Sequence, residues 1–330
     1  MIVRSESAEL VPHELPVRAL KAREVRVAVR AIGVNPVDWK LSDNGGLRLA
    51  HALLGPSGPF VCGIDFAGVV VELGEGAQGV SVGDPVAGAV DFRLRQRGSY
   101  ATEVIVRDTQ VAVLPAHVDL PAAACLPVAG VTAHMALFEH GGLQRGGKAL
   151  VLGASGGVGH LAVQLARNHG AKVFGVCSSR NAGLVTRLGA HVIAHDEGDA
   201  LERAREHGPF DVVVNAVDTQ HYPVARVAPL LAPRGRHVIL TPSPRDYPCL
   251  ARPSVTTFSA FARRESLAPL VSALADGSLE VVIADRFPLE YAEQAHQLSR
   301  TGKVVGKVVL TVNASQEPAA AHAGRPPAQA

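Results

Sequence analysis

The spacing of apolar residues divides the chain into a strand-rich first part and a second part in which strands and helices alternate. Residues 24–35, EVRVAVRAIGVN, alternate apolar and polar residues as a half-buried strand does. Residues 66–76 and 100–108 have the same character, with glycine-rich turns between them. We therefore expect residues 1–122 to form a β-rich domain.

From residue 123 to residue 277 strand-like runs are each followed by a helical period. The pairs are 148–153 with 157–169, 171–176 with 181–189, 211–214 with 222–232, and 236–240 with 265–277. Such alternation predicts an α/β domain with a doubly wound parallel sheet and right-handed crossovers. Residues 278–312 offer a strand, a helix and a last strand, and we expect them to complete the first domain. The Ala- and Pro-rich tail, 313–330, is expected to be disordered.

Composition and charge narrow the class of protein. The chain has 330 residues, 47% of them apolar and 19% charged, with a net charge of +2. It has no basic block and no apolar run long enough to span a membrane, so we expect neither a nucleic-acid nor a membrane partner. The N-terminus lacks the apolar core of a signal peptide. The four cysteines lie far apart without a CxxC pair, which favours a reducing cytoplasm.

A glycine-rich turn stands between the first strand and helix of the second part, in VLGASGGVGHLAVQLA at 151–166. Glycines let a backbone turn tightly and approach a pyrophosphate, and the following helix directs N–H groups at it. The candidate cofactor-binding residues here are Gly153, Ala154, Ser155, Gly156, Gly157, Val158 and Gly159. The alternative is a turn that needs glycine only for packing.

The end of the next strand indicates which dinucleotide would bind. An NAD site usually has a carboxylate there, on the ribose 2′-hydroxyl. This strand ends in CSSRN, where Ser178 and Arg180 offer a hydroxyl and a cation suited to a 2′-phosphate. We therefore expect NADPH, with an ordinary surface role for Arg180 as the alternative.

Many short motifs, in order along residues 15–312, resemble the medium-chain dehydrogenase/reductase superfamily. They are VNPVDWKL (34–41), VCGIDFAGVVVELGEG (61–76), VGDPVAG (82–88), GSYATEVIV (98–106), AAACLPVAGVTAHMAL (122–137), GASGGVGHLAVQLAR (153–167), VCSSRN (176–181) and the closing GKVVGKVVL. The resemblance is to the zinc-independent quinone oxidoreductase branch, which includes enoyl reductases. It implies a GroES-like catalytic domain (1–122, completed by 278–312), a Rossmann domain (123–277), an active site between them, and a homodimer.

The zinc alcohol dehydrogenases resemble this chain less at their metal ligands. Their first ligand is a cysteine in the segment that matches 34–41, which has none here. Ile64 and Asp65 stand where they have His and Glu, and the clustered cysteines of their structural zinc are absent. We therefore expect no metal. Asp65 is interpreted as a residue that caps backbone N–H groups.

The resemblance also implies site residues. Asn35 should lie beside the nicotinamide, and Asp38, Trp39 and Lys40 should line the cleft. Lys40 is the candidate for an enolate oxygen, with a surface lysine as the alternative. The segment contains no tyrosine to act as a proton donor.

Other cofactor-binding candidates are carried over by position. They are Thr132, then Asn215, Ala216 and Val217 after one strand, Leu240 and Thr241 after the next, Phe258 on a following loop, and one of Lys303 and Lys307 near the end. For the two lysines the alternative is a solvated hairpin end.

The predicted function is an NADPH-dependent, zinc-independent reductase that transfers hydride to a quinone or to a C=C bond conjugated with a carbonyl. The resemblance implies a role in secondary metabolism, where members of this branch act and a conjugate hydride addition can trigger ring closure. An Ala-, Arg- and Pro-rich composition suggests a high-GC genome, in which such pathways are frequent. The alternatives are a non-catalytic NADPH-binding protein and a zinc-type alcohol dehydrogenase. The segment RHVIL at 236–240 is the candidate edge strand for the homodimer contact.

Overall fold

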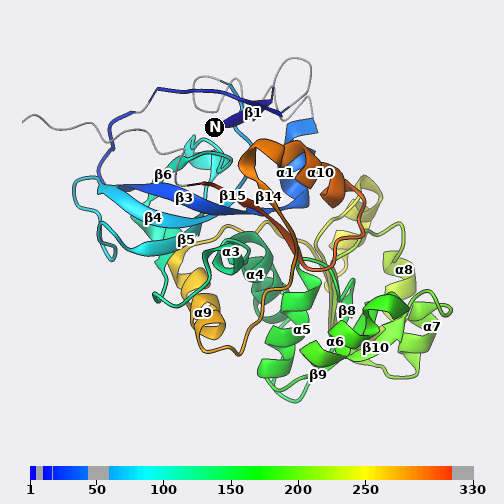
Figure 1. The fold of residues 1–330 in the computed structure, drawn as a ribbon. Helices are drawn as coiled ribbons and strands as arrows, with labels where there is room; N and C mark the ends of the chain where they lie inside the picture. Colours follow the sequence, from blue (N-terminus) through cyan, green and yellow to red (C-terminus); the bar gives the residue numbers. More distant parts are fainter. Residues whose placement is uncertain (5–9, 17, 44–58, 314–330) are drawn as a thin grey trace, which may run out of the picture.

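A computed structural model describes residues 1–4, 10–16, 18–43 and 59–313. The predicted disordered tail, beyond residue 313, lies outside the described residues. Figure 1 shows two sheets, each with its own helices, at opposite ends of the molecule. None of the helices in the described part of the chain is long and apolar enough to cross a membrane.

Six parallel strands form the first sheet, in the order β10-β9-β8-β11-β12-β13. These strands are β8 (Lys148–Leu152), β9 (Lys172–Cys177), β10 (His191–Ala194), β11 (Phe210–Asn215), β12 (Leu231–Ile239) and β13 (Val255–Thr256). The helices of this half are α4 (Leu126–His134), α5 (Gly159–Asn168), α6 (Ala182–Leu188), α7 (Ala200–Arg205), α8 (Val224–Val227) and α9 (Arg264–Ala275). The chain first runs outward from β8 to β10 and then crosses to β11. The switch point, where doubly wound sheets bind ligands, therefore lies between β8 and β11.

The second sheet has seven strands, in the order β14-β15-β3-β4-β5-β7, with β6 paired to β3. The strands are β3 (Glu24–Val34), β4 (Asp65–Leu73), β5 (Pro85–Ala89), β6 (Glu103–Arg107), β7 (Val111–Val113), β14 (Ile283–Pro288) and β15 (Lys307–Thr311). A two-stranded sheet, β1 (Ile2–Arg4) and β2 (Leu10–Pro12), lies outside it, as do α1 (Pro36–Asp43), α3 (Leu120–Ala123) and α10 (Ala292–Arg300). β3 is buried at nine of its eleven positions, with only Glu24 and Arg30 partly exposed, so the half-buried strand predicted from its alternation was wrong.

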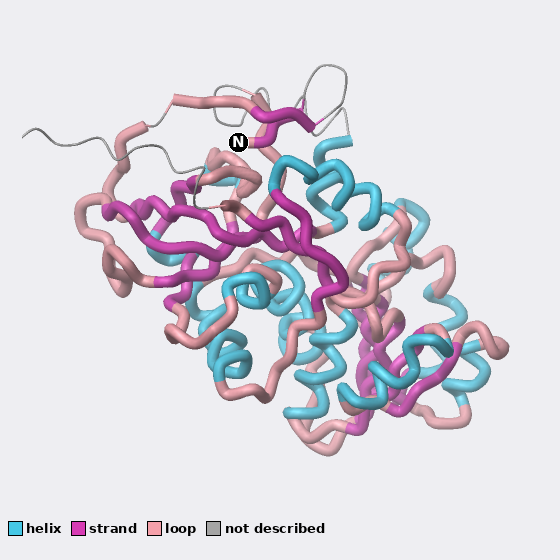
Figure 2. The backbone as a smooth tube through the Cα atoms, in the orientation of Figure 1, coloured by secondary structure: helices cyan, strands magenta, loops and turns pink. Residues whose placement is uncertain are grey.

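The chain returns from the parallel sheet to the second sheet through β14, α10 and β15. β15 pairs antiparallel with β3, so the last strand lies beside the strand that leads into α1. The N–H of Gly306, just before β15, donates to the carbonyl of Ser155 at 2.8 Å. The closing GKVVL segment therefore passes directly over the glycine-rich turn (Figure 2).

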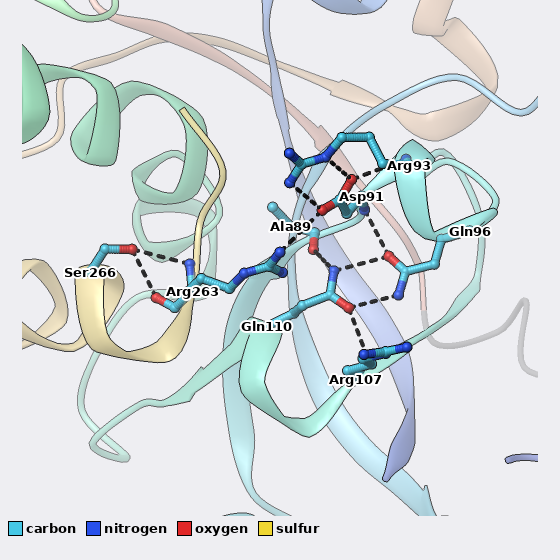
Figure 3. A network of polar contacts seen from close by, with 8 residues as sticks. All are labelled: Ala89, Asp91, Arg93, Gln96, Arg107, Gln110, Arg263 and Ser266. Carbon is cyan, nitrogen blue, oxygen red and sulfur yellow. Dashed lines mark hydrogen bonds and ion pairs between the residues drawn. The ribbon is translucent and has the colours of Figure 1, made fainter. Parts of the chain in front are cut away.

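A polar network ties the two halves together beside α9 (Figure 3). Asp91 follows β5, and Arg93 donates to both its carboxylate oxygens at 3.0 and 2.8 Å. Arg263, which precedes α9, reaches the same carboxylate at 3.3 Å. Gln96 accepts from the Asp91 N–H at 2.7 Å and pairs with Gln110 through two hydrogen bonds. The start of α9 is thus joined to the second sheet through one buried carboxylate.

Three features differ from the sequence prediction. The segment RHVIL was wrong as an edge strand, because β12 lies between β11 and β13, and residues 237 and 238 pair with residues 255 and 256. The strand β12 also begins at Leu231, inside the helix expected over 222–232. β10 and α7 had no predicted counterpart, because four and six residues are too short to show a clear period.

Candidate functional site

The glycine-rich turn lies at the switch point of the parallel sheet and has the backbone geometry that glycine permits. Gly153 follows β8 with φ of +83°, a left-handed conformation that disfavours other residues. Gly159 begins α5, and a Cβ added there would lie 2.0 Å from the carbonyl oxygen of Gly153. The turn therefore packs against its own helix as a dinucleotide site requires. Ala154, Ser155, Gly156, Gly157 and Val158 lie between these two glycines.

The candidate residues after β11 and β12 come together beside this turn. The N–H of Ala216 donates to the carbonyl of Leu152 at 3.1 Å, and Leu240 N–H donates to Asn215 at the same distance. Thr241 donates from its hydroxyl to the carbonyl of Val217. Val217 also contacts the turn directly, because a Cβ on Gly153 would lie 2.7 Å from its side chain. The strand ends thus form one continuous rim.

At the end of β9 the hydroxyl of Ser178 is buried without a hydrogen-bond partner among the described residues. Arg180 lies two residues further on, exposed, in a 3-10 turn over Ser179–Asn181. The Asn181 amide donates to the Ser155 hydroxyl at 3.1 Å, which ties this turn to the glycine-rich turn. Asp196, a carboxylate nearby, is bound by the amide and hydroxyl of Ser179, each at 2.8 Å.

Asn35 and Asp38 are buried at the start of α1, 2% and 1% exposed. Asp38 accepts the backbone N–H of Asn35 at 2.8 Å, as a carboxylate in the first turn of a helix often does. The Asn35 amide donates to Asp65 at 2.9 Å. The second oxygen of Asp65 accepts the N–H of Val128, in the first turn of α4, at 2.9 Å. Asp65 thus caps a backbone group, as interpreted from the sequence, and also holds Asn35.

Lys307 connects this buried cluster with the glycine-rich turn. It is 3% exposed, and its ammonium donates to the Asn35 side-chain oxygen at 2.5 Å and to the Val34 carbonyl at 2.9 Å. Its stem contacts the turn, since a Cβ on Gly157 would lie 3.2 Å from Lys307 Cδ. Lys303 is exposed and lies at the preceding turn. Of the two candidate lysines, the structure brings Lys307 to the turn.

Trp39 and Lys40 are placed differently from Asn35 and Asp38. The indole N–H of Trp39 donates to the hydroxyl of Ser299 on α10 at 3.1 Å. Lys40 is exposed, with its ammonium 5.5 Å from the centre of the Trp39 ring. The structure shows no contact between these two side chains and the buried cluster.

Two further candidates lie away from the cluster. Thr132 is half-buried on α4, one helical turn beyond Val128. Phe258 is half-buried and stacks on His140, with ring centres 4.3 Å apart.

The buried carboxyls have unusual acidities. Burial raises the pKa of Asp38 to about 7, a shift that the N–H of Asn35 and the charge of Lys307 oppose and the charge of Asp65 reinforces. Burial likewise raises the pKa of Asp65 to about 7, against the charge of Lys307. Both acids can therefore exchange protons near neutral pH, which is what general acid–base chemistry requires.

Two residues of this cluster were missed from the sequence. The phenol oxygen of Tyr100 lies 3.3 Å from Asp38 Oδ2 and 2.9 Å from Nε2 of His296 on α10. Tyr100 lay within the recognised segment GSYATEVIV, so a signal existed. His296 had none, because nothing in the sequence joins α10 to residues 196 positions earlier.

The chain can be compared with known proteins over nearly its whole length. Residues 21–116 match the family model for an alcohol dehydrogenase GroES-like domain, and residues 188–310 match that for a zinc-binding dehydrogenase. Among the described residues, no three His, Cys, Asp or Glu side chains gather as a metal site would need.

A chloroplastic quinone oxidoreductase from Triphysaria versicolor is 32% identical over 90% of this chain and 92% of its own length. A 2-methylene-furan-3-one reductase from Solanum lycopersicum is 30% identical over 94% and 75%. The solved quinone oxidoreductase from Coxiella burnetii superposes with a TM-score of 0.82 at 28% identity, covering 92% of this chain and 95% of that one. The fold, the two domain matches and these relatives show that the chain is an oxidoreductase belonging to the medium-chain dehydrogenase/reductase superfamily, in its quinone oxidoreductase branch.

Proposed function

We propose that this protein is an NADPH-dependent, zinc-independent reductase of quinones or of C=C bonds conjugated with a carbonyl. The observation that carries the choice of NADPH is the pair formed by Ser178 and Arg180. A buried hydroxyl without a partner beside an exposed guanidinium, at the end of the second parallel strand, suits a ribose 2′-phosphate.

The described residues fit a dinucleotide along the whole rim. The glycine-rich turn and the first turn of α5 would hold the pyrophosphate, because free N–H groups and the helix dipole favour an anion there. The ammonium of Lys307, below Gly157, adds a cation close to the same place. When bound, the reduced nicotinamide supplies a hydride.

The substrate would be acted on by the buried cluster of Asn35, Asp38 and Asp65. Lys307 lies between this cluster and the glycine-rich turn. Hydrogen bonds within the cluster hold the Asn35 amide in one orientation, and the burial of its side chains keeps water from this side of the cleft. A substrate that accepts hydride becomes an anion, which a preorganised polar site stabilises and an acid must then protonate. Quinones and conjugated alkenes accept hydride without a Lewis acid, and both chemistries occur in the names of relatives of this chain.

The choice of cofactor is tested by fluorescence titration of the wild type and Arg180→Ala with NADPH and NADH. Losing one charge-assisted contact should weaken NADPH by about 1.5–3 kcal/mol, roughly 10- to 150-fold, and leave NADH unchanged. The matched control is Arg187→Ala on α6, whose guanidinium is bound to Glu280. Equal affinity for both cofactors, unchanged in Arg180→Ala, would refute the 2′-phosphate site.

Turnover separates the proposal from a protein that binds NADPH without catalysis. The observation that favours such a binder is the exposed position of Lys40, which leaves a substrate oxygen without that partner. NADPH oxidation at 340 nm with a panel of quinones and a 2-methylene ketone decides the matter. A binder would shift NADPH fluorescence and oxidise none of it with any acceptor.

We also propose a cellular compartment, an oligomeric state and a metabolic role for this protein. We place the enzyme in the cytoplasm as a homodimer, and a reducing compartment is supported by the four cysteines, all of them described residues, because none of them forms a disulfide. Light scattering tests the dimer. A role in secondary metabolism, with the product enolate either protonated or cyclised, stays a prediction that product analysis can test.

A further inference from the structure

Three buried side chains from distant elements form a continuous hydrogen-bonded chain that ends beside Asn35. Tyr100 lies in the middle, 2.9 Å from His296 Nε2 and 3.3 Å from Asp38 Oδ2. Tyr100 and His296 are fully buried and Asp38 is 1% exposed. The three side chains are therefore shielded from bulk solvent.

The backbone around Tyr100 fixes this geometry. The N–H of Tyr100 donates to the Cys62 carbonyl at 2.9 Å, and that of Ser99 to Gly63 at 3.0 Å. Gly63 has φ of +88°, and a Cβ on it would lie 2.1 Å from the Tyr100 ring. The ring of Tyr100 thus packs directly against Gly63, where no side chain would fit.

The hydrogen-bonded chain of His296, Tyr100 and Asp38 has two possible arrangements of its protons. A phenol has one proton and can donate it to only one neighbour at a time. When Asp38 is ionised, His296 Nε2–H donates to Tyr100 and Tyr100 donates to Asp38. When Asp38 carries a proton on Oδ2, it donates to Tyr100, and Tyr100 donates to His296. The two arrangements differ by one proton moved from the imidazole to the carboxyl, without displacement of a heavy atom.

The two ends of this hydrogen-bonded chain, Asp38 and His296, have different surroundings. At one end, Asp38 is hydrogen-bonded to Asn35, and its other oxygen, Oδ1, is buried without a partner among the described residues. At the other end, Glu293 lies three residues before His296 on α10, so the two share one helix face. The Glu293 side chain is 35% exposed and pairs with Arg300, so this face of α10 reaches solvent about one turn from the imidazole.

We infer that His296, Tyr100 and Asp38 form a proton relay that supplies the proton needed by the reduced product in the cleft. The inference rests on the proposed function. It goes beyond that function by naming the source of the proton. The segment 34–41 has no tyrosine that could donate it.

A quinone or enone takes a hydride from the reduced nicotinamide and becomes a hydroquinone or enolate anion. Asp38 gives that anion its carboxyl proton and is left ionised. His296 then takes one proton from solvent and becomes an imidazolium. Its Nε2 proton passes to Tyr100 while Tyr100 gives its own proton to Asp38, which leaves the imidazole neutral and the carboxyl protonated again. Each turnover therefore consumes one hydride and one solvent proton.

The surrounding charges suit this role. The titratable groups that face Asp38 are Asp65, Lys307 and Tyr100, and those that face Tyr100 are Asp38, Asp65, Cys62 and His296. Burial raises the pKa of Asp38 to about 7, so this carboxyl both takes and gives a proton near neutral pH. Burial, with the charge of Asp38, holds the pKa of Tyr100 well above its usual range, so the phenol passes a proton on rather than ionising.

The test compares wild type with Tyr100→Phe and His296→Gln, which keep shape and remove the transferable proton. The control is Tyr291→Phe, because Tyr291 is 47% exposed at the start of α10. Single-turnover NADPH oxidation measures hydride transfer, and steady-state kcat in H2O and D2O measures the complete cycle. General acids contribute about 10²–10⁴-fold, so we expect kcat to fall at least about 10-fold in both variants, with hydride transfer changed less than about twofold.

Rescue distinguishes a relay from a structural role. Added imidazole should restore kcat in His296→Gly, since it supplies the missing proton carrier, and it should not affect wild type. Wild-type kcat and pH profile in both Tyr100→Phe and His296→Gln would overturn the relay and leave the proposed function standing. Equal loss of hydride transfer and kcat, without imidazole rescue, would also overturn it. A wild type that oxidises no NADPH with any acceptor would overturn the proposed function, and the relay with it.

Discussion

The ammonium of Lys307 lies 2.5 Å from the side-chain oxygen of Asn35, across 272 positions of the sequence. This contact joins the start of the last strand to the start of α1. Because the stem of Lys307 also contacts Gly157, one lysine connects the glycine-rich turn with the carboxyls of Asp38 and Asp65.

Replacing Lys307 should test that connection. Lys307→Met leaves two buried carboxyls without a nearby cation, and breaking a buried charge arrangement costs about 3 kcal/mol or more. Both carboxyls have a pKa raised to about 7, so they are neutral at pH 5 and ionised at pH 9. The loss in free energy of unfolding should therefore grow as pH rises through 7.

Urea denaturation at pH 5.5 and pH 8.5 measures this, with the exposed Lys303→Met as the control. The control should change stability by less than about 0.5 kcal/mol at either pH. A Lys307→Met effect that is the same at both pH values would contradict the coupling.

Two glycines should respond oppositely to alanine. Gly159→Ala would place a Cβ 2.0 Å from the carbonyl oxygen of Gly153, so the turn must open and dinucleotide affinity should fall more than about 10-fold. Gly183, on α6, has open space around it. Gly183→Ala should therefore stabilise the protein by about 0.5 kcal/mol through helix propensity, with affinity unchanged. Titration calorimetry and thermal unfolding measure the pair, and similar affinities for the two variants would count against the turn as the binding site.

His237 should make the protein sensitive to acid. It is fully buried on β12, and neither ring nitrogen has a hydrogen-bond partner among the described residues. Burial lowers its pKa from 6.5 to about 4, which the charge of Asp246 opposes only in part. The unfolded chain therefore binds a proton that the folded protein excludes, and stability falls as pH drops from 6.5 towards 4, by up to about 3 kcal/mol.

His237→Leu removes that difference, so unfolding free energy measured between pH 4.5 and 7 should fall less steeply than in wild type. The exposed His191→Leu on β10 is the control and should keep the wild-type slope. Identical slopes for wild type and His237→Leu would show that the imidazole is solvated in the folded state.

The network at Asp91 should matter more than an ion pair at the surface. The Asp91 side chain is 4% exposed, bonded to Arg93 and Arg263, and it also accepts the backbone N–H of Arg93. We expect Asp91→Ala to cost about 2 kcal/mol, because a buried multiply bonded carboxylate and a cap are lost together. Asp43→Ala, which removes the half-exposed pair with Arg300, should cost less than about 1 kcal/mol. Equal losses in chemical denaturation would show that the Asp91 network does not hold the halves together.

The sequence by itself determined the local elements of this protein. The alternation at 24–35 and the run from β8 through the glycine-rich turn to α5 depend on near neighbours, since period and glycine content reflect local backbone geometry. The absence of a carboxylate from the segment CSSRN, at the end of β9, can likewise be read directly from the sequence. Recognisable motifs in a fixed order then indicated the superfamily and both halves of the fold.

Only the tertiary structure decided which polar groups meet. Lys307 rather than Lys303 reaches the turn, because β15 pairs with β3 and Lys307, the first residue of β15, is buried by that pairing. Tyr100 reaches Asp38 and His296 because Gly63 leaves room for its ring. Strand β13, two residues long, displaces β12 from the edge of the sheet. These outcomes depend on pairing between distant segments, where burial and hydrogen bonding are settled by the whole fold and leave no periodic trace in the chain.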